Sequence, residues 1–193
     1  TTQRVSKPLV IKNRLYVGLA DGNMAAFSLE DGQLLWEQKI AIGDKFIDVD
    51  TSPVLIDGQL YANPSTGFLT ILNPDTGAIV RRLHYSVLRA PMVEKNRILL
   101  GTTDGKIVQL DRGFNLTHQR KLSNHGISSM KYWKEYLAVT TMAGEFHLLD
   151  PLSFKSLFQK HLGHSHSTVF GELKTGEGML AFISSRNRLY VFR

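Results

Sequence analysis

Short apolar runs separated by turn residues recur along the chain in a fixed order. Each copy starts with a small residue or proline and an apolar run, then passes through a turn into a second run and a further turn into a third. The central turn residue is Gly22, Gly67, Gly105, Gly144 and Asn187 in successive copies, at intervals of 38 to 45 residues. The runs are rich in Val, Ile, Leu, Tyr and Phe and are too short for helices, so they predict β-strands. Gly and Asn adopt positive φ at low cost, which suits a tight hairpin.

The copies predict three inner strands each, followed in four copies by an outer strand. The inner strands are expected at 8–11, 14–18 and 24–29; 52–56, 59–62 and 68–72; 90–93, 97–101 and 106–111; 128–130, 136–139 and 145–150; and 168–170, 179–183 and 188–192. The outer strands are expected at 33–38, 78–83, 116–121 and 155–160. Four antiparallel strands in about 40 residues form the blade of a β-propeller. The sequence therefore predicts an all-β fold, a β-propeller of about five four-stranded antiparallel blades, with residues 1–193 as a single domain.

The fifth copy reaches Arg193 without an outer strand of its own. Residues 2–6 precede the first strand and belong to no other blade, so we expect them to supply the missing strand and close the ring. An unpaired N-terminus is the alternative. Five blades that close alone, a larger ring formed as a homodimer, and a piece of a longer propeller are all compatible with the sequence.

Composition and charge narrow the possible functions. The hydrophobic fraction is 42% and the charged fraction is 21%, which is ordinary for a globular protein. The longest apolar runs have about five residues, and a membrane-spanning helix needs about 20. The chain has no cysteine, which excludes a disulfide scaffold, cysteine catalysis and thiolate metal sites. The net charge is +6, but the basic residues are scattered among strand residues, which indicates a solvated face and no nucleic-acid site.

The turns after the third strands contain a second signal. The first copy runs through an Asp-Gly pair to Trp36, and the second copy contains Asp75-Thr76-Gly77. These residues resemble the tryptophan-docking repeat of the PQQ-like propellers, in which Asp, Thr-Gly and Trp link neighbouring blades. A large ring wedged between two blades buries area that one blade cannot bury alone. The third and fourth copies keep Asp111 and Asp150 but lack the Gly and the Trp.

Within that superfamily, residues 47–54, Ile-Asp-Val-Asp-Thr-Ser-Pro-Val, are similar to a stretch of the BamB family of outer-membrane assembly lipoproteins. Arg4 lines up with an Arg of that family, and residues 187–193 resemble the family's C-terminus. The resemblance covers the whole chain, although the family has eight blades. It implies a non-catalytic scaffold at the periplasmic face of the outer membrane, which supports outer-membrane β-barrel assembly by binding a BamA-like protein. Membrane association would then depend on a lipid anchor not present in this chain.

The candidate partner-binding residues are Arg4, Asp48 and Asp50. The two carboxylates lie on the loop after the first blade, which is expected to share a face with the hairpin at Gly22. Carboxylates on such a face can form charge-assisted contacts with an arginine of a partner. Arg4 would reach the same region if its segment joins the fifth blade. The alternative for Asp50 is a turn-capping role.

Two further functions fit the repeat type. A PQQ-dependent dehydrogenase needs Ca²⁺ held by convergent carboxylates and amides, and the known enzymes place a vicinal disulfide against the cofactor. The sequence offers no such carboxylate–amide cluster and no cysteine, so we expect no enzyme activity and no cofactor. A propeller that binds another ligand or another envelope protein remains the third possibility.

Two side-chain clusters have both a chemical and a structural interpretation. His161, His164 and His166 are close enough in sequence to bind Zn²⁺ or Cu²⁺, but no fourth ligand is adjacent, so a polar loop is favoured over a metal site. Tyr132 and Trp133, together with Tyr136, would make an aromatic platform if they were exposed. As strand residues they are expected to pack inside the fold.

Overall fold

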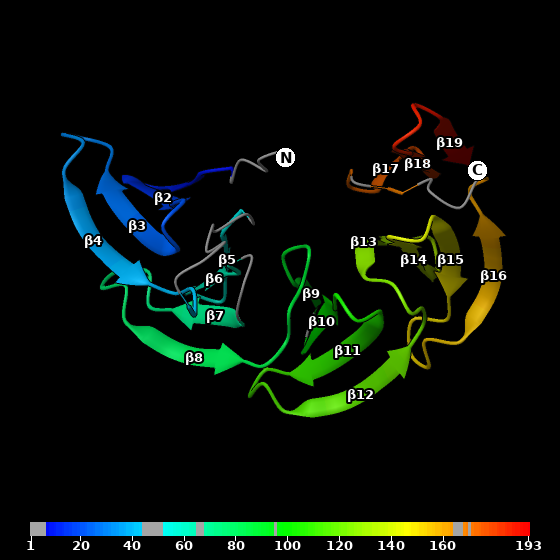
Figure 1. Cartoon of the computed structure of the whole chain (residues 1–193), viewed down its shortest axis with the longest axis horizontal. Helices are drawn as coiled ribbons and strands as arrows, with labels where there is room; N and C mark the ends of the chain where they lie inside the picture. The colour runs from blue at the N-terminus through cyan, green and yellow to red at the C-terminus, as the bar shows by residue number, and fades with distance from the viewer. Residues whose placement is uncertain (1–6, 44–51, 65–67, 95, 164–167, 170) are drawn as a thin grey trace. The chain divides into compact units, whose positions relative to one another are not determined.

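The computed structural model describes residues 7–43, 52–64, 68–94, 96–163, 168–169 and 171–193. The regular elements of these residues are β-strands, arranged in five antiparallel sheets (Figure 1). Four sheets have four strands and one has three. We call them blades one to five in chain order. The all-β prediction of propeller-type blades is confirmed.

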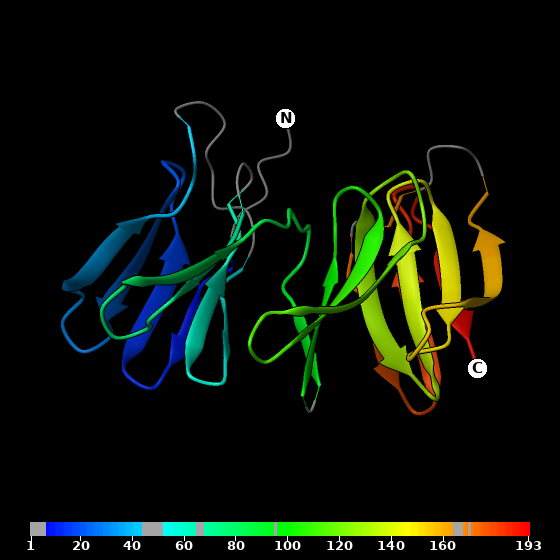
Figure 2. The same ribbon diagram turned by 90° about the horizontal axis from the view of Figure 1, so that it is seen from below.

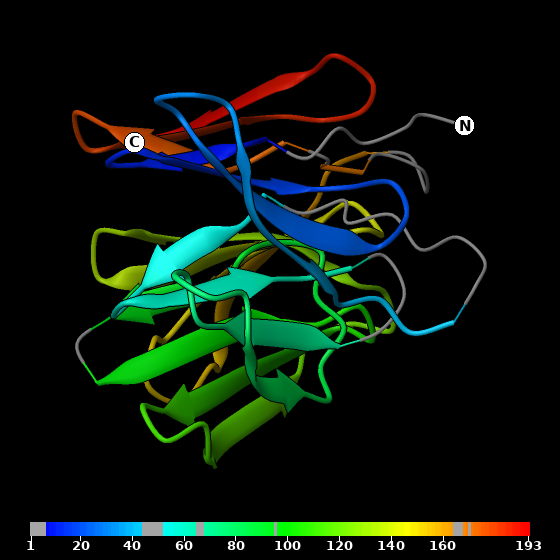
Figure 3. The same cartoon turned by 90° about the vertical axis from the view of Figure 1, so that its left-hand side faces the viewer.

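The chain divides into two compact units, Thr1–Ala90 and Pro91–Arg193. The first unit contains blades one and two, whose strong twist is visible in Figure 3. Blade one consists of β1 (Leu9–Ile11), β2 (Arg14–Gly18), β3 (Asn23–Ser28) and β4 (Leu34–Lys39). Blade two consists of β5 (Val54–Ile56), β6 (Gln59–Ala62), β7 (Leu69–Leu72) and β8 (Ile79–Leu83).

The second unit contains blades three, four and five, whose strands run alternately up and down (Figure 2). Blade three consists of β9 (Met92–Glu94), β10 (Arg97–Gly101), β11 (Lys106–Asp111) and β12 (Leu116–Lys121). Blade four consists of β13 (Ile127–Trp133), β14 (Tyr136–Thr141), β15 (Glu145–Leu149) and β16 (Ser156–His161). Blade five consists of β17 (Lys174–Gly176), β18 (Met179–Ile183) and β19 (Leu189–Phe192).

The predicted turn chemistry explains why the second and third strands of a blade form hairpins. Gly22, Gly105 and Gly144 have φ of 82°, 82° and 73°, and Asn187 has φ of 58°. These are the left-handed conformations that glycine and asparagine tolerate best. Four of the five predicted turn residues therefore adopt the expected conformation, and Gly67 lies outside the described residues.

The first strand of blade five differs from the prediction. The sequence placed it at 168–170, but β17 begins at Lys174. Val169 is fully buried although it is not in a strand, and the Thr168 hydroxyl donates to the carbonyl of Met142 at 3.0 Å. The apolar character of Val169 therefore reflects packing against blade four. Strand β17 is short and exposed, so its sequence has no apolar pattern.

The core lies between blades, where the middle strands are largely buried and the outer strands are mostly exposed. In the four blades that have four strands, the third and fourth strands share a β-bulge at the same position, and this bulge sets which outer-strand residue faces the next blade. One cluster joins blades one and two and includes Tyr16, Met24, Trp36, Leu60 and Leu72. Another joins blades three and four and includes Leu99, Ile127, Leu137 and Phe154, and a third joins blades four and five through Trp133, Phe146, Leu180 and Phe182.

Two expectations, one about residues 2–6 and one about domain organisation, remain predictions. Residues 2–6, expected to complete blade five, lie outside the described residues. The single-domain organisation over residues 1–193 is likewise not decided by the two compact units.

Candidate functional site

The loops that follow the outer strands return to the hairpin between the second and third strands of the same blade. In blade one, the N–H groups of Ile40 and Ala41 both donate to the carbonyl of Gly22 at 3.0 Å. In blade three, Leu122 and Ser123 donate to Gly105 at 2.9 and 3.2 Å. Leu162 does the same to the Gly144 carbonyl of blade four at 2.8 Å. In each of these blades, the loop and the hairpin therefore share one end.

The three predicted partner-binding residues, Arg4, Asp48 and Asp50, lie outside the described residues. The structure does describe the residues that follow them, Lys7 and Ser52. The backbone N–H of Lys7 donates to the hydroxyl of Ser52 at 3.1 Å, so the entries to β1 and β5 are adjacent.

Trp36 joins blades one and two as the sequence predicts. Its indole N–H donates to the carbonyl of Pro74 at 2.9 Å, and the side chain is 8% exposed. The ring lies against Gly77, where an added Cβ would come within 2.6 Å of ring atoms. Gly77 has φ of 73°, so both its conformation and the ring contact favour glycine. Tyr16 adds a tilted ring contact with a centroid separation of 6.0 Å.

Blades three and four form the equivalent contact with a smaller ring on the outer strand and a larger residue in the turn. The bulge registers place His118 where blade one has Trp36, and the turn places Phe154 where blade two has Gly77. The two rings contact each other with centroids 5.0 Å apart, and an imidazole nitrogen lies 3.3 Å from the Ser153 carbonyl. Phe154 is fully buried and keeps the left-handed conformation, with φ of 54°. The small ring and the large turn residue together replace the large ring and the glycine.

An arginine at the start of the second strand supports both of these contacts, and the sequence analysis did not single it out. Arg14 donates to the carbonyl of Pro74 at 3.2 Å and also pairs with Asp75. Arg97 donates to the carbonyl of Pro151 at 3.0 Å. Both arginines stand at the same place in their copies, so aligning the copies would have revealed them.

The aromatic residues of blade four pack inside the fold, as expected. Trp133 is 7% exposed and its indole N–H donates to the Gly178 carbonyl of blade five at 2.8 Å. The hydroxyl of Tyr132 accepts from Arg97 at 2.8 Å, and the same guanidinium pairs with Glu94 at 2.9 Å. Burial, with a contribution from Glu94, raises the pKa of Tyr132 to about 12. The aromatic platform is therefore not an exposed surface.

An open pocket lies at the loop end of blades three and four. Its volume is about 410 Å³, and its lining consists of Lys121, Leu122, Ser123, Asn124, His125, Ala143 and Glu145. The loop wall is held close to the blade because Gly105 has no side chain: a Cβ there would come within 2.2 Å of the Ser123 carbonyl. The other wall is the hairpin between β14 and β15.

Glu145 is the carboxylate of this pocket. Its side-chain oxygen accepts from the Thr141 hydroxyl at 2.9 Å, and its own backbone N–H donates back to that hydroxyl at 3.3 Å. Burial opposes ionisation, but hydrogen bonds from Ser123 and Thr141 and the nearby imidazoles outweigh it and lower the pKa. The carboxylate is therefore ionised at neutral pH although its side chain is only 21% exposed.

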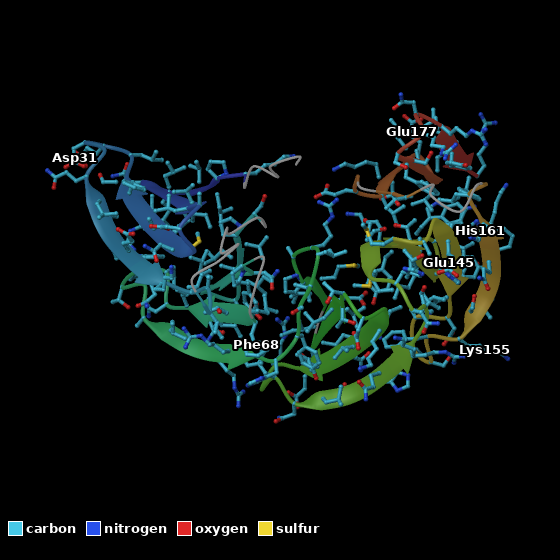
Figure 4. The ribbon with its side chains drawn as sticks, viewed as in Figure 1. Asp31, Phe68, Glu145, Lys155, His161 and Glu177 are labelled. Atoms are coloured by element: carbon cyan, nitrogen blue, oxygen red, sulfur yellow. The ribbon has the colours of Figure 1, made fainter. Side chains whose placement is uncertain are left out.

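His147 is buried beside that carboxylate. Its side chain is 3% exposed, and Nε2 lies 4.0 Å from the Glu145 oxygen, with no hydrogen-bond partner among the described residues. Burial lowers the pKa of His147, so the ring is neutral at neutral pH. In Figure 4, Glu145 and His161 lie side by side, in agreement with their pairing in the ladder between β15 and β16.

The histidine cluster is only partly described. The Nδ1 atom of His161 lies 3.2 Å from the carbonyl oxygen of Gly163. His164 and His166 lie outside the described residues. Within the described part of the chain, no three His, Cys, Asp or Glu side chains gather in a metal-binding arrangement. A search of the same residues for an apolar helix of membrane-spanning length finds none.

Comparison with known proteins agrees with the repeats. Residues 1–86 match the family described as outer membrane protein assembly factor BamB. The BamB of Kangiella koreensis is 30% identical over 173 residues, which are 84% of this chain and 44% of that protein. The BamB of Vibrio cholerae is 27% identical over 190 residues, which are 94% of this chain and 48% of that protein.

The chain is a BamB-like protein built from PQQ-type β-propeller repeats. The crystal structure of BamB from Moraxella catarrhalis has the same fold, with a TM-score of 0.74 at 19% identity. The alignment covers 99% of this chain and 58% of that one. This BamB-like chain spans less than half the length of the curated relatives named above.

Three features of the BamB-like chain could not have been found from the pattern of apolar runs. The equivalence of the His118/Phe154 pair to the Trp36/Gly77 pair can be recognised only when the bulge registers are known. The docking role of Trp133 depends on a turn in the next blade. The pocket around Glu145 is assembled from residues of two blades, so no single motif contains it.

Proposed function

We propose that the chain acts as a non-catalytic scaffold of the bacterial envelope. It would support the assembly of outer-membrane β-barrel proteins by binding the periplasmic domains of a BamA-like protein. Its place would be the periplasmic face of the outer membrane. Arg4, Asp48 and Asp50 would form the contact with the partner.

The observation that carries this proposal is the extended similarity to proteins named as outer membrane protein assembly factors. That name describes assembly, which supports a role in binding over a role in chemistry. The local structure adds support for the contact residues. Asp50 lies two residues before Ser52, and Arg4 three residues before Lys7, and those two described residues are hydrogen bonded. A residue spans at most about 3.6 Å of chain, so Arg4 and Asp50 are joined to this hydrogen bond by short links.

The test measures partner binding and folding separately. The full chain, the double variant Asp48→Ala/Asp50→Ala and the variant Arg4→Ala are captured on immobilised periplasmic domains of a BamA-like protein. We expect each variant to bind about tenfold more weakly, with unfolding changed by less than about 0.5 kcal/mol. The loss should shrink at high salt, because added ions screen exposed charge pairs.

A matched control removes the same charge elsewhere. Glu30→Ala/Glu177→Ala takes away two exposed carboxylates on turns, and its binding should equal that of the parent. Unchanged binding of the Asp48/Asp50 variant would overturn the assigned contact. Unfolding of that variant would also overturn it, since the carboxylates would then be turn-capping residues.

A further inference from the structure

The pocket of blades three and four contains a carboxylate that its own surroundings leave without a full positive partner. In the described part of the chain, the only basic group within 4.0 Å of the Glu145 carboxylate is His147, and His161, its partner across the ladder, acts on it from a longer distance. His147 is buried, which favours its neutral form at neutral pH. Lys121, the lysine of the pocket lining, donates to the backbone carbonyl of Asp104.

The carboxylate keeps room for a ligand. An ionised carboxylate offers about four acceptor sites, and the hydroxyl donors of Thr141 and Ser123 occupy part of this capacity. Those two donors also fix its orientation, so a ligand would meet a preorganised acceptor. A hydrogen bond between a carboxylate and a cationic donor is shorter and about twice as strong as one between neutral groups, so a cationic donor would suit this acceptor.

We propose that this pocket binds a cationic side chain, the guanidinium of Arg or the ammonium of Lys, presented by an extended segment of another protein. Glu145 would receive the positive charge at the side of the pocket formed by blade four. Asn124 and His125, on the opposite wall, carry groups able to hydrogen bond the backbone on either side of that residue.

The size and charge of the pocket support this ligand class over others. The volume of about 410 Å³ exceeds what a lone ion needs and lies in the range of about 300–1,000 Å³ typical of ligand sites. Glu145 would repel an anionic ligand, whereas Lys121, the lysine of the lining, already donates to the carbonyl of Asp104. This site lies in blades three and four and does not depend on the contact residues of the proposed function.

The same ladder position in blade three shows which substitutions the fold tolerates. Lys106 opens the pairing of β11 with β12 as Glu145 opens that of β15 with β16. Each donates its backbone N–H to a threonine hydroxyl, from Lys106 to Thr102 at 2.9 Å and from Glu145 to Thr141 at 3.3 Å. Glu145→Lys therefore places in blade four a residue that blade three already holds there.

The test uses capped pentapeptides of sequence Gly-Gly-X-Gly-Gly, with X as Arg, Lys, citrulline or Glu. Binding is followed through the backbone amide resonances of Ser123, Asn124 and His125. The Arg and Lys peptides should give saturable shifts at these three amides, whereas the neutral citrulline peptide should not. Glu145→Gln should weaken binding of the Arg peptide by about tenfold, and Glu145→Lys should abolish it.

Glu177→Gln serves as the control, because Glu177 is an exposed carboxylate on the turn of blade five, away from Glu145 (Figure 4). It should leave the affinity unchanged. Equal binding of the Arg and citrulline peptides would overturn the proposal, as would unchanged affinity in Glu145→Gln. If Glu145→Lys fails to fold, Glu145→Gln decides the outcome, since its amide oxygen can still accept from Thr141.

Discussion

Gly77→Ala tests whether the ring of Trp36 fixes the contact between blades one and two. A Cβ at this position would lie 2.6 Å from two atoms of the ring, so the ring or the turn must move. The ring is also held by its hydrogen bond to the Pro74 carbonyl, which limits the movement. We therefore expect a loss of stability beyond the cost of placing alanine in a left-handed turn.

Two costs contribute, and a second glycine separates them. An L-residue in the left-handed region costs about 1–2 kcal/mol, and forcing extra atoms into a packed contact costs about 1–3 kcal/mol. Gly32 has φ of 71°, close to the 73° of Gly77, but a Cβ there meets no atom within 4 Å. Gly32→Ala should therefore show the first cost alone, and Gly77→Ala should exceed it by about 1–3 kcal/mol.

Urea unfolding followed by circular dichroism measures both variants, in the parent and in a Trp36→Ala background. Removing the ring should reduce the cost of Gly77→Ala to that of Gly32→Ala, because nothing then opposes the Cβ. Equal losses of unfolding free energy for Gly77→Ala and Gly32→Ala in the parent would refute the claim that the Trp36 ring leaves no room for a Cβ at Gly77. So would a difference that persists without the ring.

Two more substitutions follow from the same comparison of blades. His147→Val places in blade four the residue that blade three holds as Val108, and by removing a buried unpaired nitrogen it should raise the free energy of unfolding by about 1 kcal/mol at pH 7. The folded-state pKa of His147 is lowered by burial, so the parent should lose stability as pH falls from about 6.5 through that lowered value, and this loss should be smaller in the valine variant. Phe154→Gly should relieve the left-handed strain but leave a cavity beside His118, for a net loss of about 2–4 kcal/mol in urea unfolding. Equal or higher stability of the glycine variant would contradict the claim that Phe154 fills the space beside the small ring of His118.

The strands were predictable where apolar runs meet a turn that requires a special residue. The bounds of β2, β6 and β10 agree with the apolar runs at 14–18, 59–62 and 97–101. The first strand of blade five was not predictable, because β17 is short and exposed and has no apolar pattern. The apolar residue Val169 is buried without being in a strand.

The candidate sites were less predictable for a different reason. The link between Trp36 and the second blade was predictable, since Trp36 and Thr76-Gly77 resemble the tryptophan-docking repeat of the PQQ-like propellers. The contact between His118 and Phe154 was not predictable from the sequence. Neither residue type indicates the other, and the position of His118 depends on the β-bulge. The role of Glu145 depends on a loop of another blade, which no local pattern encodes.

The hydrogen bonds from the outgoing loops to the hairpin glycines have a consequence for how such a protein can diverge. Because Gly22 and Gly105 hold the first residues of their loops, the rest of each loop can lengthen without disturbing the strands. Doubling the length of a flexible loop costs only about 0.6 kcal/mol in closure entropy. Insertions at these points should therefore be tolerated, and new recognition segments can be grafted there while the blades stay unchanged.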